Sequence, residues 1–304
     1  MTVVTQVVVM MLLILLGILC YKIGIVTKQV GKGISSLVLK VVNPVVILVS
    51  YQKPFDQAML AGLGWAFVLS GVCYLLALVL PLVLVRGGRD KGALAVERFS
   101  ATYSNCAFMG IPLVQGVFGA DGVFYLTAFI TLFNIFVWTH GLITMRGTGG
   151  GGIRAILPAL KTPALIATFV GLVLFLCNLQ LPEIPMLVLN DVAALNTPLA
   201  MFAAGAVIAQ TNLLSAVKNL RVYWICAVRL LIVPAASLLV MRFLPVDPVI
   251  AGTCLLAAAC PTAATGTLFA IEYGKNSAYA SELFAMTTIL SMATLPIVML
   301  VWGV

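Results

Sequence analysis

Two short segments, one in each half of the chain, place polar and helix-breaking residues inside apolar sequence. The first, residues 101–115, contains Ser104, Asn105, Gly110 and Pro112. A proline inside a helix removes one backbone N–H, and its ring crowds the preceding turn. We interpret this segment as a helix that Pro112 and Gly110 interrupt.

The second segment, residues 257–267, also combines a proline with small polar side chains. These residues are Cys260, Pro261, Thr262, Thr265 and Thr267. Irregular backbone survives at membrane depth only where protein or a water-filled cavity surrounds it. Secondary transporters use such broken helices in pairs, one per inverted repeat, to hold substrate near the midplane. The two segments therefore predict a substrate site at paired helix breaks.

Helix breaks of this kind offer hydrogen-bond donors to an anion. Each half-helix N-terminus leaves unpaired N–H groups with a partial positive charge, which attract carboxylates. Neutral side-chain donors bind an anion without a fixed counter-charge that would hold it too tightly. The predicted substrate-binding residues are Ser104, Asn105, Gly110, Ile111, Pro112, Pro261, Thr262 and Thr265. The competing interpretation is that the serine, asparagine and threonine side chains only satisfy backbone groups freed by the kinks.

Other polar residues inside apolar stretches are candidates for ion coupling or support of the site. They are Lys40, Asn43, His140, Asn196, Arg229 and Glu282. Charged groups inside a membrane are functional hypotheses by default. Lys40 and Arg229 each lie about seven residues, roughly 10 Å, from a helix end that we predict to be cytoplasmic. Snorkelling or pairing would explain Arg229. The role of Lys40 stays open, although its three-residue spacing from Asn43 predicts one shared helix face.

The remaining candidates each leave two interpretations. His140 is a proton shuttle, or a packed and hydrogen-bonded histidine, which is commoner for a lone residue of this type. Asn43 and Asn196 stand beside prolines, where they either stabilise bends or face a central cavity. Glu282 lies near a helix end, and Glu97 is expected at a cytoplasmic helix end, in contact with water. No paired intramembrane carboxylates are evident.

Composition places this chain in a membrane. Of its 304 residues, 62% are hydrophobic and 9% are charged, whereas soluble domains carry about a quarter charged residues. The net charge of +8 lies in short loops, so it indicates topology rather than nucleic-acid binding. The seven cysteines include no CxxC pair, and we expect packing roles for them. The sequence contains neither a Walker A nor an HExxH motif, so we predict no enzyme activity, cofactor or metal.

The elements that must position these residues are apolar helices, so the predicted fold class is an all-α polytopic membrane protein. Windows of about 20 apolar residues predict about ten spans. They lie at residues 3–21, 33–51, 58–85, 93–118, 122–145, 163–181, 187–210, 222–244, 249–272 and 279–303. Most of the 17 basic residues fall in loops after odd-numbered spans. That side is therefore predicted to be cytoplasmic, with both termini outside.

A glycine-rich segment divides the chain into two predicted halves. Residues 146–162 form a flexible cytoplasmic linker between a first repeat, 1–145, and a second repeat, 163–304. With an odd number of spans in each half, the second half must cross the membrane in the opposite direction. Proline positions recur five spans apart and favour such inverted repeats. These pairs are Asn43-Pro44 with Asn196-Thr197-Pro198, and Pro81 with Pro234.

The chain resembles the auxin efflux carrier family, which includes plant PIN carriers and bacterial relatives. The resemblance rests on Asn105 followed by residues 109–113, Met-Gly-Ile-Pro-Leu, and more weakly on residues 269–273 and 295–297. It implies a ten-span fold of two five-helix inverted repeats, related to bile-acid–sodium symporters. In that family the first, second, sixth and seventh spans form a scaffold, often dimeric. The other spans form a transport domain that contains crossing broken helices.

The resemblance also implies roles for single residues. The family's asparagine that matches Asn105 contacts the substrate carboxylate, and Pro112 and Pro261 match the two crossover prolines. Plant carriers commonly follow the second proline with a long amide side chain, but this chain has Thr262, which disfavours auxin itself. The third span lacks the acidic residue of the plant support site, so a role for Lys40 is not implied. Bacterial relatives are often described as malate or malonate carriers.

Together these observations predict a secondary transporter of small organic anions in the bacterial inner membrane. It would work by an elevator-like shift, with a proton or sodium as coupling ion, as a homodimer through scaffold helices. One alternative is a sodium-coupled symporter of the bile-acid type, which needs oxygen ligands clustered near the crossing. Another is a membrane receptor that binds a small acid without moving it.

Overall fold

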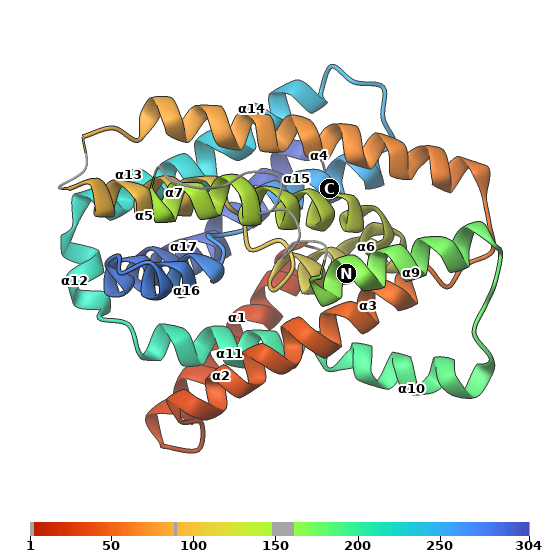
Figure 1. The fold of residues 1–304 in the computed structure, drawn as a ribbon, viewed down its shortest axis with the longest axis horizontal. Coiled ribbons are helices and arrows are strands. Elements are labelled where there is room, and N and C mark those ends of the chain that lie inside the picture. The colour runs from red at the N-terminus through yellow and green to blue at the C-terminus, as the bar shows by residue number, and fades with distance from the viewer. Residues whose placement is uncertain (1–2, 88–89, 148–160, 304) are drawn as a thin grey trace.

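The computed structural model of the chain describes residues 3–87, 90–147 and 161–303, and every regular element within them is a helix (Figure 1). In this described part, seven helices or helix runs are long and apolar enough to cross a membrane. They are Val3–Lys22, Lys28–Ser50, Gln57–Leu84, Gly110–Arg146, Glu183–Ala209, Leu220–Met241 and Ser277–Trp302. Two shorter apolar helices are Pro163–Leu176 and Pro248–Ala259. The predicted class of polytopic all-α membrane protein is confirmed.

The first half of the chain folds into helices joined by loops, with one irregular stretch inside the apolar sequence of residues 93–118. These are α1 (Val3–Lys22), α2 (Lys28–Leu37), η1 (Val38–Val42), α3 (Asn43–Ser50), α4 (Gln57–Leu84), α5 (Lys91–Thr102), α6 (Gly110–Phe136), η2 (Val137–Gly141) and α7 (Leu142–Arg146). Residues 103–109 separate α5 from α6. Inside α6, Gly119 adopts φ 64° and ψ −154°, a conformation that glycine tolerates best. The chain therefore turns at Gly119, between two predicted spans.

The second half contains a corresponding irregular stretch at residues 260–264. Its helices are α9 (Pro163–Leu176), α10 (Glu183–Ala194), α11 (Asn196–Ala209), α12 (Leu213–Lys218), α13 (Leu220–Ala227), η4 (Val228–Ile232), α14 (Val233–Met241), α15 (Pro248–Ala259), α16 (Thr265–Glu272) and α17 (Ser277–Trp302). The predicted linker, 146–162, lies mostly outside the described residues.

Three π-helical turns, η1, η2 and η4, interrupt long helices in the described part of the chain. They contain Lys40, His140 and Arg229 respectively. A π-turn is wider than an α-turn and often marks a functional site. The wider turn also changes the helix faces: Asn43 is 1% exposed, whereas Lys40 is exposed. The prediction that Lys40 and Asn43 share one face was therefore wrong.

The helices pack in two groups. In one group α1 packs closely on α11, and α3 contacts α9 and α10. These helices occupy the lower and right parts of Figure 1. In the other group α6 packs on α4 and α15, and α15 also contacts α14 and α17. Both irregular stretches belong to the second group, since they adjoin α6 and α15.

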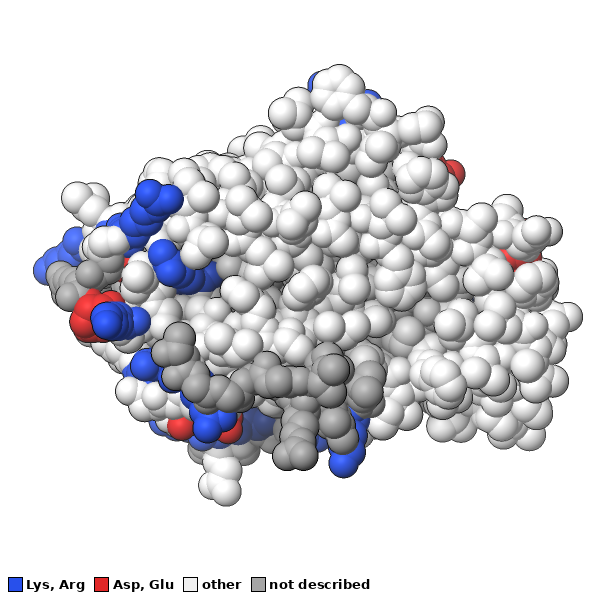
Figure 2. All heavy atoms as spheres, turned by 45° about the horizontal axis from the view of Figure 1, so that its top comes forward, with Lys and Arg blue, Asp and Glu red and all other residues white. Residues whose placement is uncertain are grey.

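Charged side chains gather at one end of the molecule. On the face drawn in Figure 2, lysine and arginine lie mostly at the end where Figure 1 places α5, α12 and α13. The remainder of this face is almost free of charge. A broad uncharged surface of this kind is what a lipid bilayer requires of the segments that cross it.

Candidate functional site

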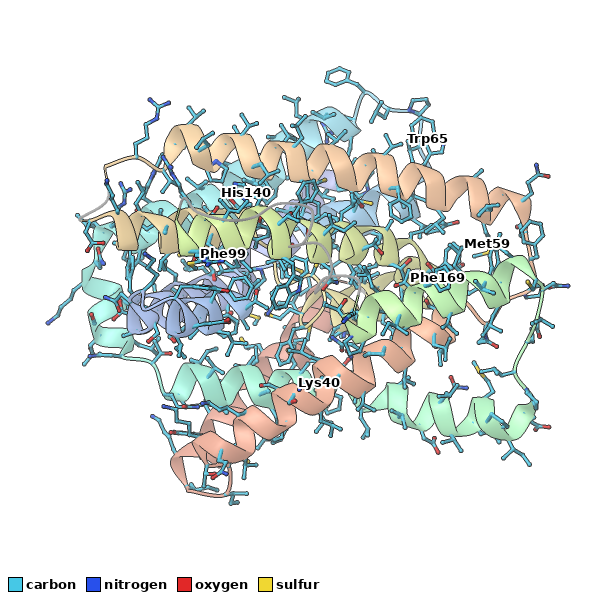
Figure 3. All side chains as sticks on the ribbon, in the orientation of Figure 1. Lys40, Met59, Trp65, Phe99, His140 and Phe169 are labelled. Carbon is cyan, nitrogen blue, oxygen red and sulfur yellow. The ribbon has the colours of Figure 1, made fainter. Side chains whose placement is uncertain are left out.

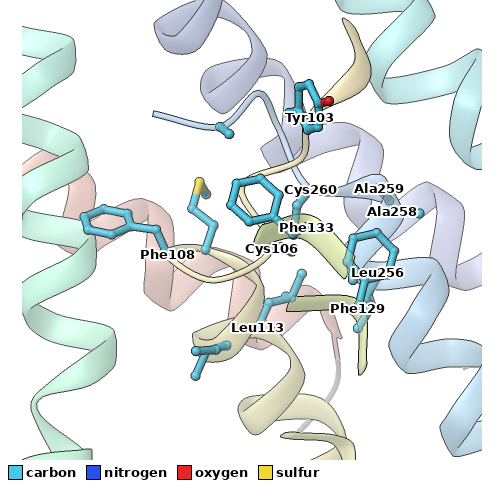
Figure 4. Packing of buried hydrophobic residues seen from close by; sticks show 14 of the residues in the cluster. Tyr103, Cys106, Phe108, Leu113, Phe129, Phe133, Leu256, Ala258, Ala259 and Cys260 are labelled. Carbon is cyan, nitrogen blue, oxygen red and sulfur yellow. The ribbon is translucent and has the colours of Figure 1, made fainter. Parts of the chain in front are cut away.

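The two irregular stretches meet and pair with each other, which we call the crossover (residues 103–109 and 260–264). Ser104 and Thr262 form an isolated antiparallel bridge. Beside it, the N–H of Asn105 donates to the carbonyl of Pro261 at 2.7 Å. Figure 4 shows the segment with Tyr103 beside the segment that carries residues 258–260. Each break thus supplies hydrogen-bond partners for backbone groups of the other. Backbone N–H and C=O groups at membrane depth need such partners, because no water is present there.

Pro112 begins a helix rather than interrupting one. Because α6 starts at Gly110, Pro112 lies in its first turn, where N–H groups have no intrahelical acceptor in any case. The helix break lies before it, at residues 103–109. The interpretation of Gly110 and Pro112 as the interrupting residues is therefore corrected. A Cβ added to Gly110 would meet Cys260 Sγ at 3.5 Å, an ordinary contact, so space does not require glycine there. Its neighbour Ile111 is fully buried.

Several donors in the crossover and in the adjoining first turn of α16 have no partner. Asn105 is 5% exposed, and its side-chain Nδ2 is buried without a hydrogen bond, as are the hydroxyls of Ser104, Thr265 and Thr267. An unpaired buried polar group costs about 1–3 kcal/mol. Thr265 begins α16, so its hydroxyl lies at the positive end of that half-helix. Unpaired donors beside a helix N-terminus are suited to an anionic acceptor.

Thr262 differs from these residues because its hydroxyl is already used. Thr262 Oγ1 donates to the carbonyl of Ser100 at 2.7 Å, and its backbone N–H donates to Thr287 Oγ1 at 3.2 Å. The side chain therefore does what the competing interpretation expected of the threonines: it satisfies a backbone group freed by the break in α5.

The C-terminal ends of α5 and α15 converge on one arginine. Arg229 is 1% exposed, and its guanidinium donates to the carbonyls of Thr102 at 3.0 Å and Cys260 at 3.1 Å. It also donates to Ala101 and Ala258. A side chain this deeply buried does not snorkel to water. The geometry matches pairing, which was the second explanation offered from the sequence. The partners of Arg229 are backbone carbonyls.

Asn43 and Asn196 contact each other, which the sequence did not predict. Asn196 Nδ2 donates to Asn43 Oδ1 at 2.5 Å, and Asn43 Nδ2 donates to the carbonyl of Ala107 at 3.3 Å. Asn196 Oδ1 has no partner. The pair therefore joins α3 and α11 of the first helix group to the crossover in the second.

Gln6 is a residue beside the crossover that sequence reasoning missed. It lies on α1, is 6% exposed, and donates from Nε2 to the carbonyl of Pro112 at 3.0 Å. A Cβ at Gly116 would lie 2.2 Å from the Gln6 side chain, so the glutamine packs directly on the first turns of α6. The available signal was a single amide inside the apolar span 3–21.

His140 reaches the crossover through a tyrosine. His140 Nδ1 and the Tyr103 hydroxyl lie 2.8 Å apart, and the hydroxyl donates to the carbonyl of Phe136. His140 also lines a cavity of about 220 Å³ together with Lys91, Arg98 and other residues. This arrangement agrees with a hydrogen-bonded histidine, and it puts two cations beside the same cavity.

Lys40 and Glu282 do not join the crossover. Lys40 is exposed on η1, in a different part of the bundle from His140 (Figure 3). Glu282 is half-buried on α17. A second cavity, of about 130 Å³, includes the neutral polar residues Ser50, Gln115 and Asn190. It lies where α3 and α10 of the first group face α6, and Gln115 follows Pro112 by one helical turn.

Glu97 corrects a further expectation. It was expected to contact water, but it is 2% exposed. Arg221 of α13 binds both of its carboxylate oxygens, at 3.1 Å and 2.8 Å, and the Tyr279 hydroxyl donates to it at 3.1 Å. Helices distant in sequence cover this carboxylate, so its position on α5 alone did not reveal the burial.

Comparison with known proteins places the sequence of this chain among membrane transport proteins. The family model described as membrane transport protein matches residues 2–154 and 152–299. A similar protein, an uncharacterized transporter of Methanothermobacter thermautotrophicus, is 25% identical over 295 residues, and the match covers 94% of each chain.

Proposed function

We propose that this chain, which belongs to the auxin efflux carrier family of membrane transport proteins, is a secondary carrier of small organic anions. That the protein is a membrane transporter follows from the family. The substrate class, the elevator movement and the absence of enzyme activity are part of the proposal. Carboxylates such as malate and malonate, and auxin-like acids, are the substrates to be tested.

The observation that carries the proposal is the unpaired amide of Asn105. Its Nδ2 is buried in the crossover without a partner, where a carboxylate oxygen would satisfy it. The hydroxyl of Thr265 lies unpaired at the N-terminus of α16. A partial positive charge of about half an elementary charge at such a terminus favours an anion. This field would repel a cationic substrate, and a neutral substrate would gain less from it than an anion does.

The proposed architecture has ten spans in two inverted repeats, residues 1–145 and 163–304. Gly119 divides the run Gly110–Arg146 in two, and the pairs α5–α6 and α15–α16 are each proposed to make one broken span. Both termini would then lie on the same, outer side of a bacterial inner membrane. The hydrogen bond between Asn43 and Asn196 supports the repeats, since corresponding residues of two repeats meet at their symmetry axis.

The elevator movement is proposed from the two helix groups. The group formed by α1, α2, α3, α9, α10 and α11 would be the scaffold, through which a homodimer forms. The group with α6 and α15 would carry the crossover across the membrane. Gln6 donates a side-chain hydrogen bond to the carbonyl of Pro112, and Asn43 donates one to the carbonyl of Ala107. Both are among the contacts that such a shift must break. The cavity at Gln115 and Asn190 lies at this boundary.

Flux and binding together test this function. Purified protein would be screened by thermal unfolding against malate, malonate, succinate, lactate and indole-3-acetate, because a ligand of the folded state raises the melting temperature. The acid that binds is then followed as flux into proteoliposomes. Asn105→Ala is expected to lower both the anion affinity and the flux by about tenfold or more. A loss of this size corresponds to one hydrogen bond to a charged group.

Asn134→Ala is the matched control, because this buried asparagine bonds within its own helix, to the carbonyl of Ile130. It should retain anion binding. No shift with any carboxylate would refute the organic-anion proposal. Binding without flux would favour the receptor, and sodium-dependent binding would favour the bile-acid-type symporter. A proton gradient that drives flux in sodium-free buffer would identify the coupling ion.

A further inference from the structure

Arg229 lies where the negative ends of two half-helices meet. Its guanidinium donates to four backbone carbonyls, those of Ala101 and Thr102 at the end of α5 and those of Ala258 and Cys260 at the end of α15. The arginine itself comes from the π-helical turn η4. A third element thus places one cation between the two broken helices.

No carboxylate accompanies this cation among the described residues. The two ion pairs found there join Lys53 to Asp121 and Arg221 to Glu97. Each helix C-terminus carries about half a negative elementary charge, so the two ends together carry about one. The charge of Arg229 is therefore balanced by the backbone of α5 and α15 alone.

The same carbonyls would otherwise form a cation site. Unwound backbone and half-helix C-termini coordinate the sodium ion or proton in transporters built from broken helices. Carbonyl oxygens are ligands of hard cations. In this chain the guanidinium already occupies that place and satisfies these groups. No cluster of acidic, histidine or cysteine ligands for a cation occurs elsewhere in the part of the chain that the structure describes.

We infer that Arg229 is a built-in cation that takes the place of a coupling sodium ion at the crossover, so that the organic anion binds without sodium. The inference rests on the proposed function, transport of an organic anion. It excludes sodium as the coupling ion of that transport. A permanent charge holds the ends of α5 and α15 together in every state of the transport cycle, whereas a bound ion would do so only when present. The donors of Asn105 and Thr265 stay free for the substrate.

The test compares cations at constant ionic strength. The melting temperature and the anion Kd of the wild type are expected to be the same in sodium chloride and in choline chloride. Arg229→Met leaves four buried carbonyls without their donor, and its melting temperature should fall by several degrees. Sodium is then expected to bind these oxygens, to restore part of the stability, and to lower the anion Kd of the variant by about tenfold, a typical coupling between two sites.

Arg242→Met is the matched control. Arg242 also donates to a carbonyl, that of Val301, but it is exposed, so its loss should change neither stability nor sodium response. Arg229→Lys retains the charge and should stay sodium-independent with intermediate stability; it decides the question if Arg229→Met does not fold. Sodium-specific stabilisation of the wild type, or a fully stable Arg229→Met, would overturn the inference. If no anion binds at all, the proposed function fails, while the melting temperatures still test Arg229.

Discussion

Replacing Gly205 by alanine should drive apart α1 and α11, which pack closely on each other. Gly205 of α11 faces Gly17 of α1. A Cβ at Gly205 would lie 2.3 Å from the carbonyl oxygen of Ile14 and 2.9 Å from the N–H nitrogen of Ile18. Both are backbone atoms of α1, so a rotamer change cannot relieve the contact. Small residues at helix crossings in membranes serve this close approach.

The magnitude follows from the distance. Restoring an ordinary contact of about 3.4 Å needs a separation of roughly 1 Å, and a gap of 0.5–1 Å forfeits about a quarter to a half of each dispersion contact. Overpacking of this kind costs about 1–3 kcal/mol. Alanine regains about 1 kcal/mol of helix propensity. Because the atoms in contact belong to rigid backbone, the overpacking cost is expected at the upper end of its range, and the net expected loss is about 2 kcal/mol. A loss of this size lowers the melting temperature by about 4–8 °C at 2–4 °C per kcal/mol.

The assay is thermal unfolding in detergent, with Gly64→Ala as the matched control. Gly64 lies in the interior of α4, and nothing is within 4 Å of a Cβ built on it. The control gains helix propensity without a clash and should melt at or slightly above the wild-type temperature. Equal melting temperatures for the Gly205 and Gly64 variants would refute the close crossing of α1 and α11.

Three further variants test single contacts by unfolding in mixed micelles. Arg221→Met removes the partner of buried Glu97 and should cost about 3 kcal/mol, because an uncompensated charge stays buried. Asn43→Ala removes the amide between the two helix groups and should cost about 1–3 kcal/mol, since its partners lose a donor and an acceptor. Thr262→Val leaves the carbonyl of Ser100 unpaired and should cost about 1–2 kcal/mol, whereas Thr262→Ser should retain the wild-type stability.

Each of these variants has an outcome that contradicts its reasoning. A double variant that also carries Glu97→Gln should recover part of the loss in Arg221→Met, because no buried charge remains; an additive loss would mean that the two residues do not interact. Unchanged stability in Asn43→Ala would mean that water replaces the amide. Equal losses in the valine and serine variants of Thr262 would assign the effect to packing rather than to the hydroxyl.

The helix breaks were predictable because their signals are local. The polar residues and prolines in 101–115 and 257–267 stand out against apolar sequence, and the structure places irregular backbone in both. The position of the first break was misjudged by several residues. A proline starts a helix as readily as it interrupts one, and only the backbone shows that α6 begins at Gly110.

The partners across the crossover were not predictable from one sequence. Arg229 and Thr262 are recognisable as polar residues inside spans, but their acceptors are carbonyls, which every residue carries. Glu97 was expected to face water because its own helix ends nearby, and Arg221 of the second half covers it. The π-helical turn at Lys40 changed the helix face that a regular spacing predicts.

What the sequence by itself determined is the environment of the chain: apolar length and sparse charge require membrane-spanning helices, and the broken segments require partners at depth. Family membership followed from the motif around Asn105. What only the tertiary structure decided is which groups satisfy one another there. The backbone bonds at Ser104 and Thr262, the four carbonyls at Arg229 and the contact of Asn43 with Asn196 join residues far apart in sequence. Hydrogen bonds act over about 3 Å in space, and residue spacing carries no record of such long-range neighbours.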